Sequence, residues 1–263
     1  MLIDINCDLG ESFGVYVYGS DPEMMPLITS ANIACGAHGG DPTVMRTSVE
    51  LALAHDVAIG AHVGLDDRNG FGRREIPTTP QQAYDLCLYQ IGALDAFLRV
   101  VGARMQHVKL HGALYMMANN EHELAEGVCR AVSAWDPGLL LYVLPGSELQ
   151  RCAEEHGLRA VTELFADRPY IGHDVRMYKR SADLIGDTAA VVGRTLALLA
   201  QFGRSAIGSV CLHSDTPGAP EMLRALRFAL SDEGCSFAPP RDAAWMEYFT
   251  NTKNTASIQK RIS

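Results

Sequence analysis

Residues 2–8 read Leu-Ile-Asp-Ile-Asn-Cys-Asp, a short run with β-branched residues in which polar side chains take every second position. Residues two apart on a strand share a face, so Asp4, Asn6 and Asp8 lie on one side of this strand, opposite Ile3 and Ile5. Further short apolar runs lie at residues 28–35, 57–64, 106–112, 139–144, 160–167 and 207–213. The sequence therefore predicts seven strands.

Stretches with helical periodicity separate these runs, at residues 42–55, 80–101, 121–135, 147–156, 187–201 and 220–231. Alternation of strand and helix predicts parallel strands with crossover helices outside them. Seven such units favour a closed or nearly closed α/β barrel, and a doubly wound open sheet is the alternative. We expect one domain over residues 1–245 and a frayed, polar tail over residues 246–263.

The composition narrows the possible partners. The 263 residues carry a formal net charge of −9, which leaves no basic surface for nucleic acid. Asp4 and Asp8 occupy the positions where a signal peptide would have its basic and apolar regions, and no stretch has the length of a membrane span. We therefore expect a cytoplasmic protein that does not contact a membrane, and its seven cysteines to be buried, reduced thiols.

Several other strands repeat the polar face of the first one. His107, Lys109 and His111 alternate with Val108 and Leu110, and polar residues are also in phase in the third, sixth and seventh strands. An unpaired polar group in a barrel interior lowers the stability of the fold by several kcal/mol. Many strands with inward polar faces therefore imply that these residues serve one common function. Half-exposed strands of an antiparallel sheet are the alternative, which the strand-helix alternation disfavours.

Polar residues also gather where the predicted strands end, the edge at which α/β proteins bind ligands. Asp8, His38 and His62 could ligate a divalent metal. Without a metal, Asp8 or His62 could act as a base, while Lys109 and His111 polarise a substrate. A lysine buried beside two histidines is expected to have a lowered pKa.

Other features of the sequence concern anionic ligands. Arg73 and Arg74 could bind an anionic substrate group, or could form a solvated surface pair. The sequence contains no Gly-rich phosphate-binding loop of a familiar kind, so no nucleotide pocket is predicted for this chain itself.

A series of motifs gives the chain a family resemblance. The segments are residues 3–11 (IDINCDLGE), 30–36 (SANIACG) followed by His38, 59–64 (IGAHVG), 70–75 (GFGRRE), 89–94 (YQIGAL), 107–115 (HVKLHGALY) and 165–170 (FADRPY). In combination they resemble the LamB/YcsF family from the first strand to about residue 230. The resemblance implies a distorted seven-stranded (β/α) barrel of the glycoside hydrolase/deacetylase type.

The resemblance also implies a function. The expected reaction is ATP-driven hydrolysis of the lactam 5-oxo-L-proline to L-glutamate, carried out with two partner subunits, B and C. An alternative is a metal-dependent deacetylase or hydrolase that acts on another small amide or lactam. A non-catalytic binding or scaffolding subunit is a third possibility, and self-association into a homo-oligomer is left open.

The site residues expected on these grounds fall into three groups. The catalytic group is Asp8, His62, Lys109 and His111. The substrate-binding group is Glu11, Asn32, His38, Arg73, Arg74, Asp167, Arg168, Tyr170 and His213. The metal ligands, if a divalent metal is bound, are Asp8, His38 and His62.

Overall fold

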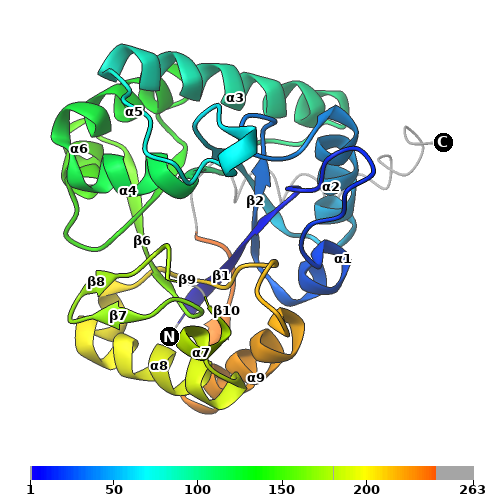
Figure 1. Ribbon diagram of the computed structural model, residues 1–263, viewed down its shortest axis with the longest axis vertical. Coiled ribbons are helices and arrows are strands. Elements are labelled where there is room, and N and C mark those ends of the chain that lie inside the picture. Colours follow the sequence, from blue (N-terminus) through cyan, green and yellow to red (C-terminus); the bar gives the residue numbers. More distant parts are fainter. Residues whose placement is uncertain (1, 180, 241–263) are drawn as a thin grey trace.

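A computed structural model describes residues 2–179 and 181–240 of the chain. Seven parallel strands form a closed barrel in the order β1-β2-β3-β4-β5-β6-β9, and β9 pairs back onto β1 (Figure 1). The strands are β1 (Leu2–Leu9), β2 (Ser30–Ala34), β3 (Ala58–Val63), β4 (His107–Leu110), β5 (Leu140–Val143), β6 (Arg159–Phe165) and β9 (Ser209–Cys211). The predicted (β/α) barrel is thus confirmed, and the open sheet is not observed. The predicted tail, residues 246–263, lies outside the described residues.

Helices surround the strands on their outer side (Figure 1). Those at predicted positions are α2 (Pro42–Ala54), α3 (Pro80–Val100), α5 (His122–Trp135), α6 (Glu148–Glu155), α8 (Thr188–Phe202) and α9 (Ala219–Asp232). Local chemistry fixes where several of them begin. Asp41 accepts a hydrogen bond from the backbone N–H of Val44 ahead of α2, and Thr79 forms a capping box with Gln82 ahead of α3.

Some short elements were not predicted. They are the helices α1 (Asp21–Met24), α4 (Gly112–Asn120) and α7 (Ala182–Ile185), the 3-10 turns Met25–Leu27, Arg68–Gly70 and Arg204–Ala206, the antiparallel pair β7 (Tyr170–Ile171) and β8 (Asp174–Val175), and β10 (Ser236–Phe237). β10 runs parallel to the start of β1, outside the barrel. No helix in the described parts of the chain is long and apolar enough to cross a membrane.

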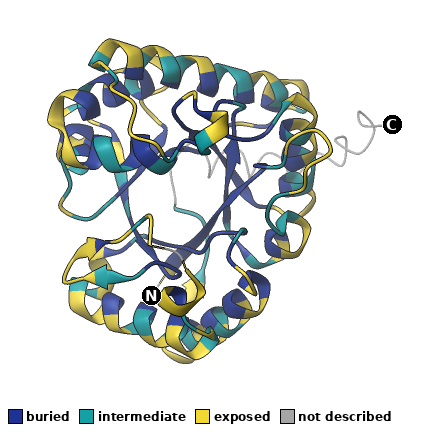
Figure 2. Ribbon diagram, in the orientation of Figure 1, coloured by how far each residue is buried: buried dark blue, intermediate teal, exposed yellow. Residues whose placement is uncertain are grey.

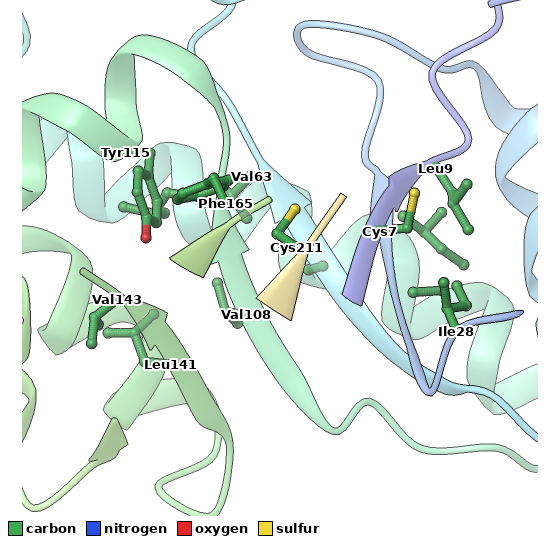
Figure 3. Packing of buried hydrophobic residues seen from close by; sticks show 14 of the residues in the cluster. Cys7, Leu9, Ile28, Val63, Val108, Tyr115, Leu141, Val143, Phe165 and Cys211 are labelled. Carbon is green, nitrogen blue, oxygen red and sulfur yellow. The ribbon is translucent and has the colours of Figure 1, made fainter. Parts of the chain in front are cut away.

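The main hydrophobic core lies between the strands and the helices. Figure 3 shows this packing around residues such as Val108, Leu141 and Val143, which are fully buried. Figure 2 shows the strands buried at the centre and the exposed faces of the helices turned outward. All seven cysteines are buried and free, as predicted.

The barrel interior is largely polar, as the alternation predicts. At its amino-terminal end, the Asp4 carboxylate accepts hydrogen bonds from the hydroxyl groups of Thr29, Ser30, Tyr142 and Ser209. These donors come from different parts of the sheet, so one buried carboxylate links several strands.

Two further features fill this end of the barrel. A small apolar cluster of Leu140, Tyr142 and Val161 packs inside it. His107 occupies the space beside Gly60, where a β-carbon would lie 2.1 Å from its ring.

Candidate active site

The carboxyl-terminal ends of the strands bring ionisable side chains to one rim of the barrel. β1 leads into Glu11, β2 leads towards His38, β3 carries His62, and β4 carries Lys109 and leads into His111. All five residues are buried. Residues separated by about 100 positions therefore meet in one place, as expected for the ligand-binding edge of a parallel barrel.

Lys109 lies at the centre of a buried charge network. Its Nζ lies 3.2 Å from Asp8 Oδ1 and 3.0 Å from Glu163 Oε2, and it donates a hydrogen bond to Asn6 Oδ1 at 2.9 Å. The same ammonium group lies 4.9 Å from the centre of the Phe165 ring. The two carboxylates and the aromatic face together stabilise a positive charge at this point.

The lowered pKa predicted for Lys109 is wrong. Burial alone would lower it, but Asp8 and Glu163 outweigh burial and hold the pKa of Lys109 well above its usual value. The prediction considered only the two histidines on the same strand face. Carboxylates contributed by β1 and β6 favour the cationic form of Lys109 instead.

Asp8 connects Lys109 to two histidines. Its Oδ2 lies 3.2 Å from His62 Nε2 and 3.4 Å from His213 Nε2, and its Oδ1 accepts a hydrogen bond from Asn32 at 2.8 Å. Burial opposes ionisation of Asp8, but the neighbouring His62 and Lys109 side chains hold its pKa well below the usual value. Asp8 is therefore a carboxylate that can accept a hydrogen bond from a bound molecule.

His213 is oriented by a second carboxylate. Asp167 Oδ1 lies 2.9 Å from His213 Nδ1, and Asp167 also pairs with Arg168 at 2.8 Å. Although burial opposes it, His213 and Arg168 keep the pKa of Asp167 below its usual value. This arrangement places His213 between two carboxylates, with Nε2 directed towards Asp8.

A second group of four side chains lies beside Asp8. Glu11, His38, His62 and His111 each offer one ligand atom, and these four atoms all lie within 4.8 Å of one another. Burial lowers the pKa of His38 and His111 well below the usual value. Gly72 makes this crowding possible, because a β-carbon there would lie 2.8 Å from atoms of both His38 and His111.

The described residues contain other groups that could hold a divalent metal. One consists of Asp8, Cys211 and His213, and another of Glu126 on α5, Cys152 on α6 and His156 directly after α6. The first belongs to the barrel rim, while Glu126 and His156 are only partly buried.

The two predicted arginines occupy different environments. Arg73 Nη2 lies 3.4 Å from Asp215 Oδ2, and its guanidinium stacks on Phe71 at 4.8 Å. Arg74 pairs with Asp67 on the neighbouring turn, and its side chain is 64% exposed. Arg73 faces the site, whereas Arg74 lies outside it.

A small pocket opens among these groups, with a free volume of about 20 Å³. It is lined by Asp8, Arg73, Lys109, Leu110, His111, Gly112, Tyr115, Phe165, Arg168, Met177 and His213. That volume accommodates about one water molecule. A more open hollow of about 500 Å³ lies next to β7 and β8, and Tyr170 contributes to its wall.

Other predicted residues support the pocket rather than line it. Asn32 lies deeper in the barrel, where its amide also donates to Asn6 at 2.8 Å. The Tyr170 hydroxyl accepts a hydrogen bond from the backbone N–H of Phe165 at 3.0 Å. Asp167 lies behind His213.

Sequence reasoning gave no role to Glu163 or Phe165, which both contact Lys109. The alternation along β6 had placed Glu163 in phase with Asp167, and it puts residue 165 on the same inward face.

Comparisons with known proteins agree with this architecture. Residues 3–244 match the model of the LamB/YcsF family. The A subunit of 5-oxoprolinase from Bacillus licheniformis is 47% identical to the chain, with 86% of this chain and 93% of the relative covered. A protein of the same name from Thermus thermophilus is 44% identical, with 89% and 98% covered.

A solved structure is also similar. The crystal structure of a lactam utilization protein from Thermus thermophilus superposes with a TM-score of 0.81 at 40% identity, covering 91% of this chain and 100% of that one. The matched family model, these relatives and the shared barrel lead to one conclusion: the chain belongs to the LamB/YcsF family.

Proposed function

We propose that this chain is the A subunit of an ATP-dependent 5-oxoprolinase, which hydrolyses 5-oxo-L-proline to L-glutamate together with two partner subunits, B and C. Relatives at 44% to 47% identity that are named as the A subunit of 5-oxoprolinase support the proposal. The word "subunit" in those names implies a complex of several chains. The lactam utilization protein that shares the fold points to the same class of substrate.

The chemistry explains the need for ATP. A five-membered lactam is a poor electrophile, and transfer of the γ-phosphoryl group of ATP to its oxygen would activate the ring carbon. Water would then add to that carbon, the C–N bond would break, and the nitrogen would take up a proton. A second water would hydrolyse the resulting acyl phosphate and release inorganic phosphate. We assign ATP binding to the partner subunits, because this sequence has no familiar phosphate-binding loop.

The observation that carries the proposal is the buried contact of Lys109 with Asp8 and of Asp8 with His213 at the pocket. In this mechanism the Lys109 ammonium stabilises the negative charge of the phosphoryl group carried by the substrate oxygen. Asp8, with His62 and His213 beside it, takes a proton from the attacking water and returns it to the leaving nitrogen.

Positive groups around the pocket suit a substrate with a carboxylate. Arg73 and Arg168 both line it and could bind that group. Glu11, His38, His62 and His111 could hold a divalent metal, which when bound would polarise a carbonyl group or lower the pKa of a water molecule.

The test is a substrate screen of the assembled complex. The chain is purified together with candidate B and C subunits of a 5-oxoprolinase, and glutamate release from 5-oxo-L-proline is measured with and without ATP. We expect release only with ATP and only with all three subunits. Release by a complex that lacks this chain would contradict the proposal.

The alternative is a metal-dependent hydrolase or deacetylase that acts on another small amide or lactam. The group of three histidines and one glutamate favours it as a second candidate, because such ligands suit a catalytic metal. The same screen includes other lactams, cyclic imides and N-acetylated compounds. Hydrolysis of one of these by the chain alone, without ATP and in proportion to bound metal, would establish this second function.

A further inference from the structure

Three of the four side chains beside Asp8 have the spacing of metal ligands. His111 Nδ1 lies 2.9 Å from His62 Nε2 and 3.4 Å from Glu11 Oε1, and His62 Nε2 lies 3.8 Å from Glu11 Oε1. A tetrahedral ion with bonds of about 2.0–2.1 Å holds its ligand atoms about 3.3 Å apart. The three observed distances lie on either side of that value.

Each of the rings of His62 and His111 has an inner nitrogen that faces the cluster and an outer nitrogen that faces away from it. The partners of the outer nitrogens show where the ring protons lie. His62 Nδ1 lies 3.2 Å from the backbone oxygen of Lys109, and His111 Nε2 lies 2.8 Å from the backbone oxygen of Phe71. A carbonyl oxygen only accepts, so each outer nitrogen carries a proton and donates it. In a neutral imidazole the inner nitrogen then presents a lone pair. This pairing of an outer N–H with a backbone carbonyl is typical of metal-bound histidines.

Without a cation, these inner atoms repel one another. The lone pairs of His62 and His111 face each other at 2.9 Å, next to the Glu11 carboxyl oxygen. One added proton could form a hydrogen bond between the rings of His62 and His111, or between His62 and Asp8. In either case Glu11 and His111 would still have no hydrogen bond between them. A single divalent ion would satisfy all three ligand atoms at once.

His38 has a different role from the other two histidines. Its ring is stacked on that of His111, with an interplanar angle of 3° and a centroid separation of 3.7 Å. An ion lies close to the plane of each imidazole that binds it, and it cannot lie in two parallel planes. His38 Nε2 lies 3.1 Å from Glu11 Oε1, which suits a hydrogen bond donated to a ligating carboxylate.

We propose that Glu11, His62 and His111 bind one divalent transition-metal ion, with a coordination position left open and with His38 orienting Glu11. The inference rests on the geometry of the rim and not on the lactam chemistry proposed above. Two imidazoles and one carboxylate suit zinc and its neighbours such as cobalt. Compared with the set predicted from sequence, the assignment keeps His62 and takes Glu11 and His111 in place of Asp8 and His38.

The test is a metal titration of the isolated chain. The protein is stripped with a chelator and titrated with zinc or cobalt, and bound metal is measured by elemental analysis. We expect one equivalent of zinc per chain, a rise in melting temperature with zinc, and visible absorption bands of cobalt in a tetrahedral N/O site. Folding of each sample is checked by circular dichroism.

Variants separate ligands from the positioning residue. Glu11→Gln and His111→Ala are expected to weaken zinc binding more than 100-fold. His38→Ala is expected to weaken it about 10-fold to 100-fold while one equivalent still binds at saturation. His156→Ala, in the separate group with Glu126 and Cys152, is the matched control and should change nothing.

Three outcomes would overturn the inference. The folded chain could bind no zinc or cobalt, which would leave shared protons as the explanation of the cluster. The bound equivalent could be lost in His156→Ala and kept in Glu11→Gln. Loss of all binding in His38→Ala, to the same degree as in His111→Ala, would refute the three-ligand set. Metal binding without lactam hydrolysis in the assembled complex would support the metal site and contradict only the proposed function.

Discussion

Both ends of the barrel interior contain buried charged residues, but the pairing of these residues differs between the two ends. At the amino-terminal end, the carboxylate of Asp4 accepts hydrogen bonds from four hydroxyl groups. Each of these donors has a partner, and the apolar residues Leu140 and Val161 close the remaining space. Such an arrangement stabilises the fold and leaves nothing available for a ligand.

At the carboxyl-terminal end the charges are crowded instead of paired one to one. Asp8 is shared by Lys109, His62 and His213, and Glu11 faces three imidazoles. Burial and the charge of Asp8 raise the pKa of Glu11 well above its usual value. Buried ionisable groups that do not satisfy one another's charges and hydrogen bonds indicate a site for a ligand or an ion. The comparison therefore predicts that changes at the two ends act on different quantities.

The largest effect is expected from Asp4→Ala at the amino-terminal end. Four hydroxyl donors would lose their acceptor, and each of the three that are buried (Ser30, Tyr142 and Ser209) costs about 1–3 kcal/mol when left unpaired. We expect the free energy of unfolding to fall by at least about 4 kcal/mol in urea titration. Tyr142→Phe removes one donor and keeps the carboxylate, so it should cost only about 1 kcal/mol. Equal costs for the two variants would contradict the structural role of Asp4.

Lys109→Met tests the carboxyl-terminal end. Loss of the buried ammonium should lower kcat/KM of the assembled complex about 10²-fold to 10³-fold, which is about 3–4 kcal/mol of transition-state stabilisation. It should also destabilise the fold, because Asp8 and Glu163 lose their counter-charge. Adding Glu163→Gln should recover part of the stability and none of the activity. Recovery of activity in the double variant would assign Lys109 a purely structural role.

Asp21, close to the crowded rim, is expected to make stability depend on pH. It accepts a hydrogen bond from the backbone N–H of Gly10, and burial raises its pKa from 3.8 to about 6. Its contribution to stability is therefore full below pH 4 and is lost as the pH rises through 6. Asp21→Asn does not titrate, so its free energy of unfolding relative to wild type should rise by up to about 3 kcal/mol between pH 4 and 7. Urea titrations at several pH values measure this, and a flat difference would contradict the raised pKa.

The smallest expected effect tests the packing of side chains and not their charge. Gly60→Ala would place a methyl group 2.1 Å from the His107 ring inside the barrel, and overpacking of this kind costs about 1–3 kcal/mol. Gly193→Ala on the outer helix α8 meets no atom within 4 Å and should stabilise the fold by up to about 1 kcal/mol. Melting temperatures would therefore move in opposite directions. Two shifts of the same sign would contradict the tight packing of His107.

Much of the fold follows from local patterns. The seven strands and six main helices were predictable because apolar alternation and capping residues such as Asp41 and Thr79 act within a few positions. α4 was not predicted, because its apolar residues Tyr115, Met116 and Met117 continue directly from a strand end. β7, β8 and β10 contain two residues each and carry no periodic signal.

The membership of the candidate site was predictable only in part, and the pairing of its residues was not predictable. Alternation along β1 and β4 places Asp8 and Lys109 inside the barrel, and the strand ends place the histidines at one rim. Which atom faces which depends on strand stagger and ring rotation, and neither is visible in sequence. That is why the charge of Lys109 was mispredicted and why Glu11 received no place among the metal ligands.

The free volume of about 20 Å³ between Lys109, Phe165 and Met177 has a kinetic consequence. A lactam with its carboxylate is several times larger than a single water, so we expect the side chains that line the pocket to move before it can enter. Capture of the substrate should therefore be gated, with an observed rate that levels off as concentration increases. For the same reason, growing crystals in the presence of the lactam should succeed more readily than diffusing it into crystals already formed.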